Sequence, residues 1–148
     1  MSVLRDFPDL PPVWAAGALV LQFAATASLP LARFDLAGIG WAVLGVGIAL
    51  IGWSAYWFWR KRTSIEPRDT PSALIVEGPF RLNRNPIYSG MAICLLGTGV
   101  ILGSLAALLL VPTFLWIVTR RFVLGEEAAL RAAFGPEAEA YIARTRRW

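Results

Sequence analysis

The thirteen residues from Gly78 to Gly90, GPFRLNRNPIYSG, join a charged loop to an apolar stretch. An acidic pair, Glu126-Glu127, follows at the far end of the next long apolar region. Backbone shaped by Gly and Pro is tolerated beside lipid-length helices only where protein covers it or where it lines a cavity. The sequence therefore predicts a site at a membrane surface, formed by this turn and the acidic pair.

The composition is typical of a membrane protein. Of the 148 residues, 57% are hydrophobic and 16% are charged, and the mean hydropathy is +0.58. Soluble domains carry about a quarter charged residues. We expect residues 1–148 to form a single domain that has the bilayer as its main solvent.

Four apolar stretches are long enough to cross the hydrocarbon core, which takes roughly 20 residues in a helix. They run over about 13–32, 38–59, 87–103 and 104–124. The last two meet at Gly103-Ser104 almost without a loop, which predicts a tight hairpin, and Pro112 predicts a kink in its second arm. The predicted fold is an all-α polytopic membrane protein with about four transmembrane helices, a loop at 60–86 and a helical cap at 125–148.

Basic residues indicate the orientation. The 60–86 loop and the C-terminal part of the chain from Arg120 onward hold twelve of the fourteen Lys and Arg residues, and basic residues of this kind usually collect in cytoplasmic segments. With four crossings these segments share one side, so we expect a protein of the cytoplasmic membrane with both termini and the cap in the cytoplasm. The pI near 10 then reflects a basic rim facing anionic lipid headgroups. We expect no nucleic-acid partner, because no aromatic-basic stacking module accompanies the charge.

A cleaved signal over residues 1–27 is an alternative for the first apolar stretch, because Ala25-Thr26-Ala27 resembles a cleavage site. The region before it is weakly charged, since Asp6 and Asp9 offset Arg5. We therefore expect the segment to be retained as the first crossing.

Few residue types are available for chemistry. Cys94 is the single cysteine, and the chain has no histidine. Without a second cysteine or any imidazole we expect no disulfide and no metal site, so carboxylates, Tyr, Arg and backbone groups must carry any reaction.

Prolines in the 60–86 loop forbid a long helix and stiffen the backbone. A solvated connector is one interpretation of such a loop. However, the loop also has an apolar run from Ala73 to Val76, followed by Phe80, which a connector does not need. We expect the loop to fold back on the helices as a lid.

Several short motifs follow one another in the order seen in an enzyme family. They are Gly-Pro-Phe-Arg, then Arg-Asn-Pro-x-Tyr-x-Gly, an apolar hairpin, Glu-Glu, and a tail with Phe-Gly-x-Glu, a Tyr and an Arg-rich end. From about Thr63 to Trp148 this order resembles the isoprenylcysteine carboxyl methyltransferase and phospholipid methyltransferase superfamily of integral membrane enzymes. The resemblance implies methyl transfer from S-adenosylmethionine to a lipophilic acceptor, either a phospholipid headgroup amine or a prenylcysteine-like carboxylate.

The resemblance also implies a cofactor pocket. The residues that match the family's motifs are Arg84, Asn85, Pro86, Tyr88, Gly97, Gly99, Glu126 and Glu127. Many members carry His where this chain has Asn85, and Asn also occurs at this position in phospholipid-methylating relatives. A role for an imidazole is therefore not expected, and the prenylcysteine branch is slightly less favoured.

The chemistry of S-adenosylmethionine suits these residue types, because its sulfonium, ammonium, carboxylate and adenine call for acidic groups, guanidinium or N–H groups and apolar walls. We expect Glu126 and Glu127 to meet the ammonium or the ribose, and Arg81 or Arg84 the carboxylate, although Arg84 would equally suit an interface anchor. Tyr88 would stack or donate a hydrogen bond. Either glutamate is the candidate catalytic base for an amine acceptor.

The other candidates also have structural alternatives. Glu127 and Arg131 have the spacing of an ordinary i,i+4 ion pair. Gly97 and Gly99 would let a ligand approach the backbone, but small residues in this helix equally suit helix packing. Asn85-Pro86 has the residue types of a helix start, with Asn as the cap and Pro in the first turn.

After the acidic pair, the sequence predicts a helix that ends at Gly135-Pro136 and a second helix that runs to about Arg144. Tyr141 and Arg144 are the candidates for substrate binding. The residues expected to cover the pocket or hold a headgroup are Phe134, Tyr141, Arg144, Arg146, Arg147 and Trp148. The arginines would otherwise only anchor the tail at an anionic surface.

Two other functions stay open at this level. One is a non-catalytic four-helix membrane subunit or small-molecule carrier, although transport favours charged residues within the helices. The other is a lipid-modifying enzyme of another kind, such as a membrane reductase. Binding of S-adenosylmethionine would discriminate among the three, and the sequence leaves the oligomeric state open.

Overall fold

The computed structural model describes residues 7–29, 31–66 and 68–148, so Arg5 and Asp6 of the N-terminal segment lie outside the described part. Within these residues the fold is all-helical and has no strand, which confirms the predicted class. The helices are α2 (Pro11–Ser28), α3 (Ala37–Lys61), α4 (Pro86–Ile101), α5 (Leu105–Leu108), α6 (Leu110–Val118), α7 (Leu124–Phe134) and α8 (Pro136–Arg144). A 3₁₀ turn, η1 (Gly78–Arg81), precedes α4, and a π-helical turn, η2 (Thr119–Val123), joins α6 to α7.

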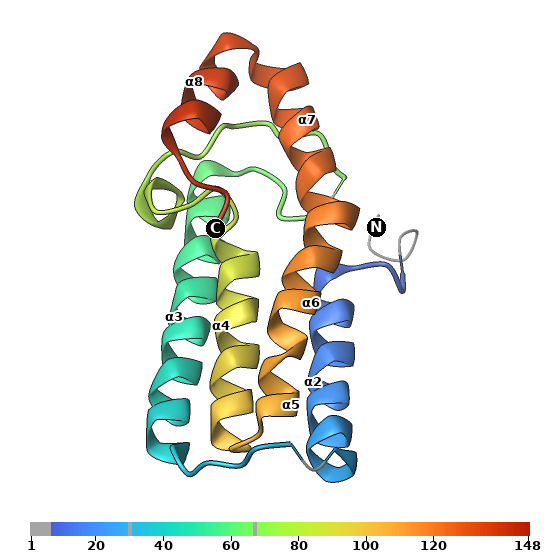
Figure 1. The fold of residues 1–148 in the computed structure, drawn as a ribbon. Helices are drawn as coiled ribbons and strands as arrows, with labels where there is room; N and C mark the ends of the chain where they lie inside the picture. The colour runs from blue at the N-terminus through green and yellow to red at the C-terminus, as the bar shows by residue number, and fades with distance from the viewer. Residues whose placement is uncertain (1–6, 30, 67) are drawn as a thin grey trace.

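The helices stand beside one another as columns, in the order α3, α4, α5 with α6, and α2 (Figure 1). Taken in chain order, successive columns are antiparallel to one another, and α7 continues α6 beyond the ends of the other columns. The short helix α8 folds back from α7 to complete a cap. The start of α2, the end of α3, the start of α4 and the C-terminus therefore all lie near this cap end (Figure 1).

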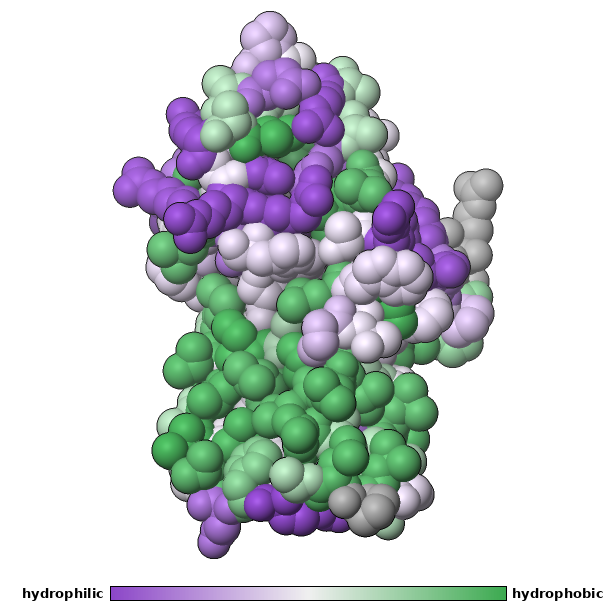
Figure 2. All heavy atoms as spheres, in the orientation of Figure 1, coloured by the Kyte–Doolittle hydropathy of each residue, from purple (hydrophilic) through white to green (hydrophobic). Residues whose placement is uncertain are grey.

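Apolar side chains cover most of the molecule below the cap, polar side chains gather over the cap, and a smaller polar patch lies at the opposite end of the bundle (Figure 2). Val20, Trp41 and Trp116 are all more than 60% exposed. Two described helical stretches, Ala37–Lys61 and Leu105–Phe134, are long and apolar enough to cross a membrane, and only 17% and 28% of their apolar windows are buried. Because these helices face outward, they suit lipid better than the core of a soluble protein.

Local sequence signals place the helix breaks. Pro112 lacks an N–H group and its ring crowds the carbonyl four residues earlier, at Leu108, so the helix is interrupted between α5 and α6. The tight turn predicted at Gly103-Ser104 is present, and the Ser104 hydroxyl accepts a hydrogen bond from the Ala107 N–H at 3.3 Å. The predicted break at Gly135-Pro136 is also confirmed, because α7 ends at Phe134 and α8 begins at Pro136.

Glycines allow α3 and α4 to pack closely. A Cβ atom added at Gly97 would lie 2.6 Å from the Leu44 backbone nitrogen and 2.9 Å from the Gly40 carbonyl oxygen. A Cβ atom at Gly99 would lie 2.7 Å from the Leu108 side chain of α5. Both glycines therefore occupy helix-packing positions, in agreement with the packing alternative.

We expect Gly97→Ala to destabilise the protein in detergent by about 1–3 kcal/mol, because the backbones of α3 and α4 must move apart. Gly45→Ala on α3 is the matched control, since nothing lies within 4 Å of its added Cβ atom. Thermal unfolding monitored by circular dichroism measures both variants. Equal midpoints for the two variants would contradict the close packing at Gly97.

Candidate functional site

A cavity of about 440 Å³ lies where the helical columns meet the cap. Its walls come from the start of α2, the end of α3, the loop at residues 62–66 and 68–77 (here the lid loop), η1, the start of α4, α7 and α8. The volume falls in the usual range for small-molecule sites, roughly 300–1,000 Å³. The site candidates from the sequence that line it are Arg84, Asn85, Pro86, Tyr88, Glu126, Glu127 and Tyr141.

The lid loop is packed against the bundle, as its apolar residues predict. Ile75 of the lid loop and Phe80 of η1 are buried and form a cluster with Tyr141 of α8, and Phe58 of α3 packs against this cluster. The Tyr141 hydroxyl donates a hydrogen bond to the Phe80 carbonyl oxygen at 2.8 Å. Burial raises the pKa of Tyr141 to about 12, so this hydroxyl keeps its proton at neutral pH.

The turn from the lid loop into η1 requires a glycine. Gly78 has a φ of 57°, and a Cβ atom at this position would lie 2.0 Å from the Trp57 indole nitrogen. Only Gly combines this backbone conformation with the absence of a side chain. The Gly-Pro-Phe-Arg motif therefore fixes where the lid loop crosses the end of α3.

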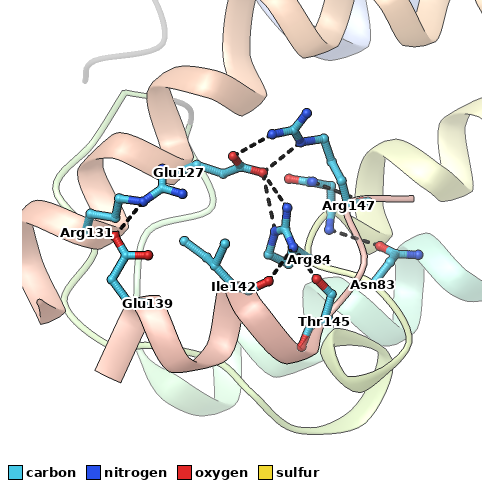
Figure 3. Close-up of polar contacts among 9 residues, drawn as sticks. Asn83, Arg84, Glu127, Arg131, Glu139, Ile142, Thr145 and Arg147 are labelled. Atoms are coloured by element: carbon cyan, nitrogen blue, oxygen red, sulfur yellow. Dashed lines mark hydrogen bonds and ion pairs between the residues drawn. The ribbon is translucent and has the colours of Figure 1, made fainter. Parts of the chain in front are cut away.

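Glu127 is the centre of a buried ion-pair network (Figure 3). Arg84 donates to its Oε1 from Nη2 at 2.9 Å and from Nε at 3.3 Å. Arg147 donates from Nε to Oε1 and from Nη2 to Oε2, both at 2.8 Å. The Glu127 carboxylate raises the pKa of Arg147, and a carboxylate held by two guanidinium groups accepts a proton poorly. Glu127 is therefore placed to hold the turn before α4 and the C-terminal residues against α7.

The pair predicted between Glu127 and Arg131 is not formed, and that alternative is wrong. Arg131 instead binds Glu139 of α8 at 2.8 Å, on the surface of the cap (Figure 3). The reason is that Arg84 and Arg147 already occupy both Glu127 oxygens.

The residues after α8, 145–148 (the C-terminal tail), lie against the turn that begins α4. The Arg84 backbone N–H donates to the Arg146 carbonyl oxygen at 2.8 Å, and the Asn85 side-chain amide donates to the Arg147 carbonyl oxygen at 3.1 Å. Arg84 Nη1 also donates to the Ile142 carbonyl at 2.9 Å and to the Thr145 carbonyl. Asn85 stands at the cap position of α4 and Pro86 at its start, as predicted, but the Asn85 side chain holds the tail and does not cap the helix.

Glu126 has a different environment from its neighbour. The Tyr88 hydroxyl donates a hydrogen bond to the Glu126 carboxylate, and both residues line the cavity. Tyr88 is 8% exposed and Glu126 is half-buried. Glu126 is therefore the member of the acidic pair whose carboxylate is available to a molecule in the cavity.

The structure does not bring every candidate to the cavity. Arg81 and Arg144 are exposed and do not line it, although Arg144 lies over the Tyr141 ring at 6.0 Å. Gly97 and Gly99 lie about 16 Å or more along α4 from Pro86, at 1.5 Å per residue. These two glycines face α3 and α5 and do not line the cavity.

The residues predicted to cover the pocket also differ among themselves. Tyr141 is 2% exposed and lines the cavity, whereas Trp148 is 37% exposed and Phe134 is half-buried, and neither of these two lines it. The expected inward turn therefore holds for Tyr141 only.

Several cavity residues gave no signal in the sequence. Glu66, Arg68 and Asp69 of the lid loop line the cavity, and so do Leu10 and Pro11 at the start of α2. Their contacts join segments far apart in the chain, which neither helix periodicity nor motif spacing reveals.

A family model described as phospholipid methyltransferase matches residues 36–137, which is more than half of the chain. The matched range includes the Arg84–Tyr88 turn and the acidic pair, and it excludes α2 and the last residues of the C-terminal tail. Comparison with curated proteins and with solved structures gave no match.

Proposed function

Because the chain belongs to the phospholipid methyltransferase family, a family of membrane methyltransferases, we propose that it transfers a methyl group from S-adenosylmethionine to a lipophilic acceptor. The cavity between the bundle and the cap carries this proposal, because its wall unites Tyr88 and Glu126 with the lid loop. A phospholipid headgroup amine is the preferred acceptor, and a prenylcysteine-like carboxylate is the alternative.

The residues of the cavity suit this cofactor. Glu126 offers a negative charge to a sulfonium or ammonium group, and the rings of Phe58, Phe80 and Tyr88 offer walls to a flat base. Arg68 is a guanidinium group on the wall that would meet a carboxylate. When bound, the cofactor supplies the reactive methyl group.

The chain's own residues then position the acceptor and manage its proton. Glu126 is the proposed proton acceptor for an amine, and the Tyr88 hydroxyl orients its carboxylate through their hydrogen bond. The lid loop and Tyr141 limit the access of water from the cap side. A carboxylate acceptor would need no base, so the role of Glu126 distinguishes the two acceptor classes.

We also propose four crossings, by α2, α3, α4 and the helix that begins at Leu105, with the cap and both termini in the cytoplasm. The opposite directions of successive columns and the basic residues near the cap support this arrangement. Single cysteines at Ser64 and at Asp35, in a Cys94→Ala background, test it. We expect an impermeant thiol reagent to label Asp35→Cys in intact cells and Ser64→Cys only after permeabilisation; the opposite pattern would contradict the orientation.

The test of function uses the purified protein in detergent. We expect calorimetry to show saturable binding of S-adenosylmethionine, and cofactor carrying a labelled methyl group to label a species in a total membrane lipid extract. Identification of the labelled species gives the acceptor. Absence of cofactor binding would refute the proposal, and binding without transfer to any lipid fraction would favour a non-catalytic subunit.

A further inference from the structure

Asp9, two residues before the start of α2, receives hydrogen bonds from three different parts of the chain. The Trp14 indole N–H donates to Oδ1 at 2.9 Å. Arg121 of η2 donates in a bidentate manner, from Nε to Oδ1 at 2.8 Å and from Nη2 to Oδ2 at 2.9 Å. Arg68 of the lid loop donates to Oδ2 and, at 3.3 Å, to the Asp9 carbonyl oxygen. We call these four residues the Asp9 clasp.

Aromatic rings support both arginines of the clasp. The Arg121 guanidinium lies 5.2 Å from the centre of the Trp14 ring, and the Arg68 guanidinium lies 5.2 Å from the centre of the Phe122 ring. Arginine over an aromatic face adds a cation–π attraction to the ion pair. Hydrogen bonds from Arg121 and Trp14 hold the pKa of Asp9 well below its usual range, so its charge persists through neutral pH and is lost only in strong acid.

The clasp lies at the edge of the cavity. Arg68 lines the cavity from the lid loop, and Leu10 and Pro11, which directly follow Asp9, line it from the start of α2. Asp9 and Trp14 precede the family-matched range of 36–137, whereas Arg68 and Arg121 lie within it. The N-terminal segment thus adds a carboxylate that joins two parts of the matched region.

We propose that Asp9 is a positioning residue that holds the lid loop closed over the cavity through Arg68. Arg121 and Trp14 fix the carboxylate, and Arg68 is the connection that opens when a molecule enters or leaves. The consequence for a bound molecule rests on the proposed function, but the contact between the clasp and the lid loop does not.

The exposure of the clasp suits a connection that opens reversibly. The side chains of Asp9, Arg68 and Arg121 are 25%, 41% and 47% exposed. Exposed ion pairs contribute little individually and are screened by salt, with a Debye length of about 8 Å at 0.15 M and about 3 Å at 1 M. The clasp therefore shifts the balance between closed and open lid by a small factor, and high salt should favour the open lid.

Hydrogen–deuterium exchange of the lid-loop amides tests the proposal without any cofactor. We expect Asp9→Asn to raise exchange in the lid loop about three- to tenfold, as the loss of a modest ion-pair network implies. Asp9→Glu should restore most of the protection. Asp35→Asn is the matched control, because Asp35 is exposed in the loop between α2 and α3, at the end of the bundle away from the cap.

The dependence of lid-loop exchange on salt tests whether the clasp acts through its charges. Raising sodium chloride to 1 M should increase lid-loop exchange in the parent to the level of Asp9→Asn, and should leave the variant unchanged. Arg68→Gln, which releases the lid loop and keeps the bond between Asp9 and Arg121, should reproduce the effect if Asp9→Asn folds poorly. Unchanged lid-loop exchange in both variants, or an equal increase across α2 and α6, would overturn the proposal.

The affinity for S-adenosylmethionine separates this inference from the proposed function. We expect the dissociation constant for S-adenosylmethionine to rise about three- to tenfold in Asp9→Asn, matching the change in lid closure. Unchanged affinity despite faster lid exchange would overturn the role of the clasp in binding. A parent protein that does not bind the cofactor would refute the proposed function. The exchange experiment would still show whether Asp9 holds the lid loop closed through Arg68.

Discussion

Glu127→Ala is expected to destabilise the cap and release the C-terminal tail. The substitution removes the carboxylate that both Arg84 and Arg147 contact, and the Arg84 side chain, only 9% exposed, is left without its charge partner. Breaking one side of a buried ion pair costs about 3–5 kcal/mol. That loss is a large part of the free energy of unfolding of a typical folded protein, which is about 5–15 kcal/mol. Thermal unfolding in detergent and hydrogen exchange of α7, α8 and residues 145–148 measure the effect.

Glu139→Ala is the matched control for this prediction. Glu139 also pairs with an arginine of the cap, Arg131, but the side chains of that pair are 59% and 42% exposed. Exposed pairs of this kind contribute about 0–1 kcal/mol, so its unfolding midpoint should hardly move. Similar midpoints for the two variants would show that the buried network does not stabilise the cap.

A double variant separates structural support from ligand contact. Replacing Arg84 and Glu127 together by Met and Leu removes both members of the buried pair, which is often neutral for stability. We expect this protein to recover much of the stability that Glu127→Ala loses. If Glu127→Ala instead keeps its stability and loses cofactor affinity, Glu127 is a ligand contact and the structural interpretation is wrong.

The helices and their breaks follow from signals that act over a few residues. Apolar length predicted helices in all four stretches, although α2 ends at Ser28, before the predicted limit of 32, and only two described stretches are long and apolar enough to cross a membrane. Gly135-Pro136 predicted the break between α7 and α8, because Pro at a helix start and Gly just before it are local preferences. The apolar run beside Phe80 predicted the packing of the lid loop for the same reason, since buried apolar side chains need no distant partner to be identified.

The polar contacts of the site depend on partners that sequence spacing does not reveal. Glu127 meets Arg84 across 43 positions and Arg147 across 20, whereas spacing favoured Arg131, four positions away. Gln22 shows the same limit, because its side-chain amide donates to carbonyl oxygens of Leu95 and Ala107 on two other helices. Contacts of this kind follow from the packing of whole helices and not from any local pattern.

The two glutamates also looked equivalent in sequence. Adjacent residues of an α-helix point about 100° apart, because each turn takes 3.6 residues. On α7 this difference directs Glu127 to the arginines of the turn and tail, and Glu126 to Tyr88 and the cavity. A π-helical turn lies directly before α7, and no motif in the sequence predicts a π turn.

Glu126→Gln is expected to abolish most methyl transfer to an amine while the protein stays folded. The amide keeps the size of the side chain and accepts a hydrogen bond from Tyr88, but it cannot take a proton at neutral pH. Loss of a general base typically lowers the rate by about 10²–10⁴-fold. Initial rates with labelled cofactor and the identified acceptor give kcat, and calorimetry gives the cofactor affinity.

Two further variants make this result specific. Tyr88→Phe removes only the hydroxyl that orients Glu126, so we expect kcat to fall by less than in Glu126→Gln and the pH profile of kcat to shift. Glu137→Gln, on the exposed face of α8, should leave kcat unchanged. If Glu126→Gln keeps the parent kcat, the acceptor atom carries no proton that must be removed. That outcome would contradict the role of Glu126 as the base, and it would suit an acceptor such as an ionised carboxylate, which accepts a methyl group without a base.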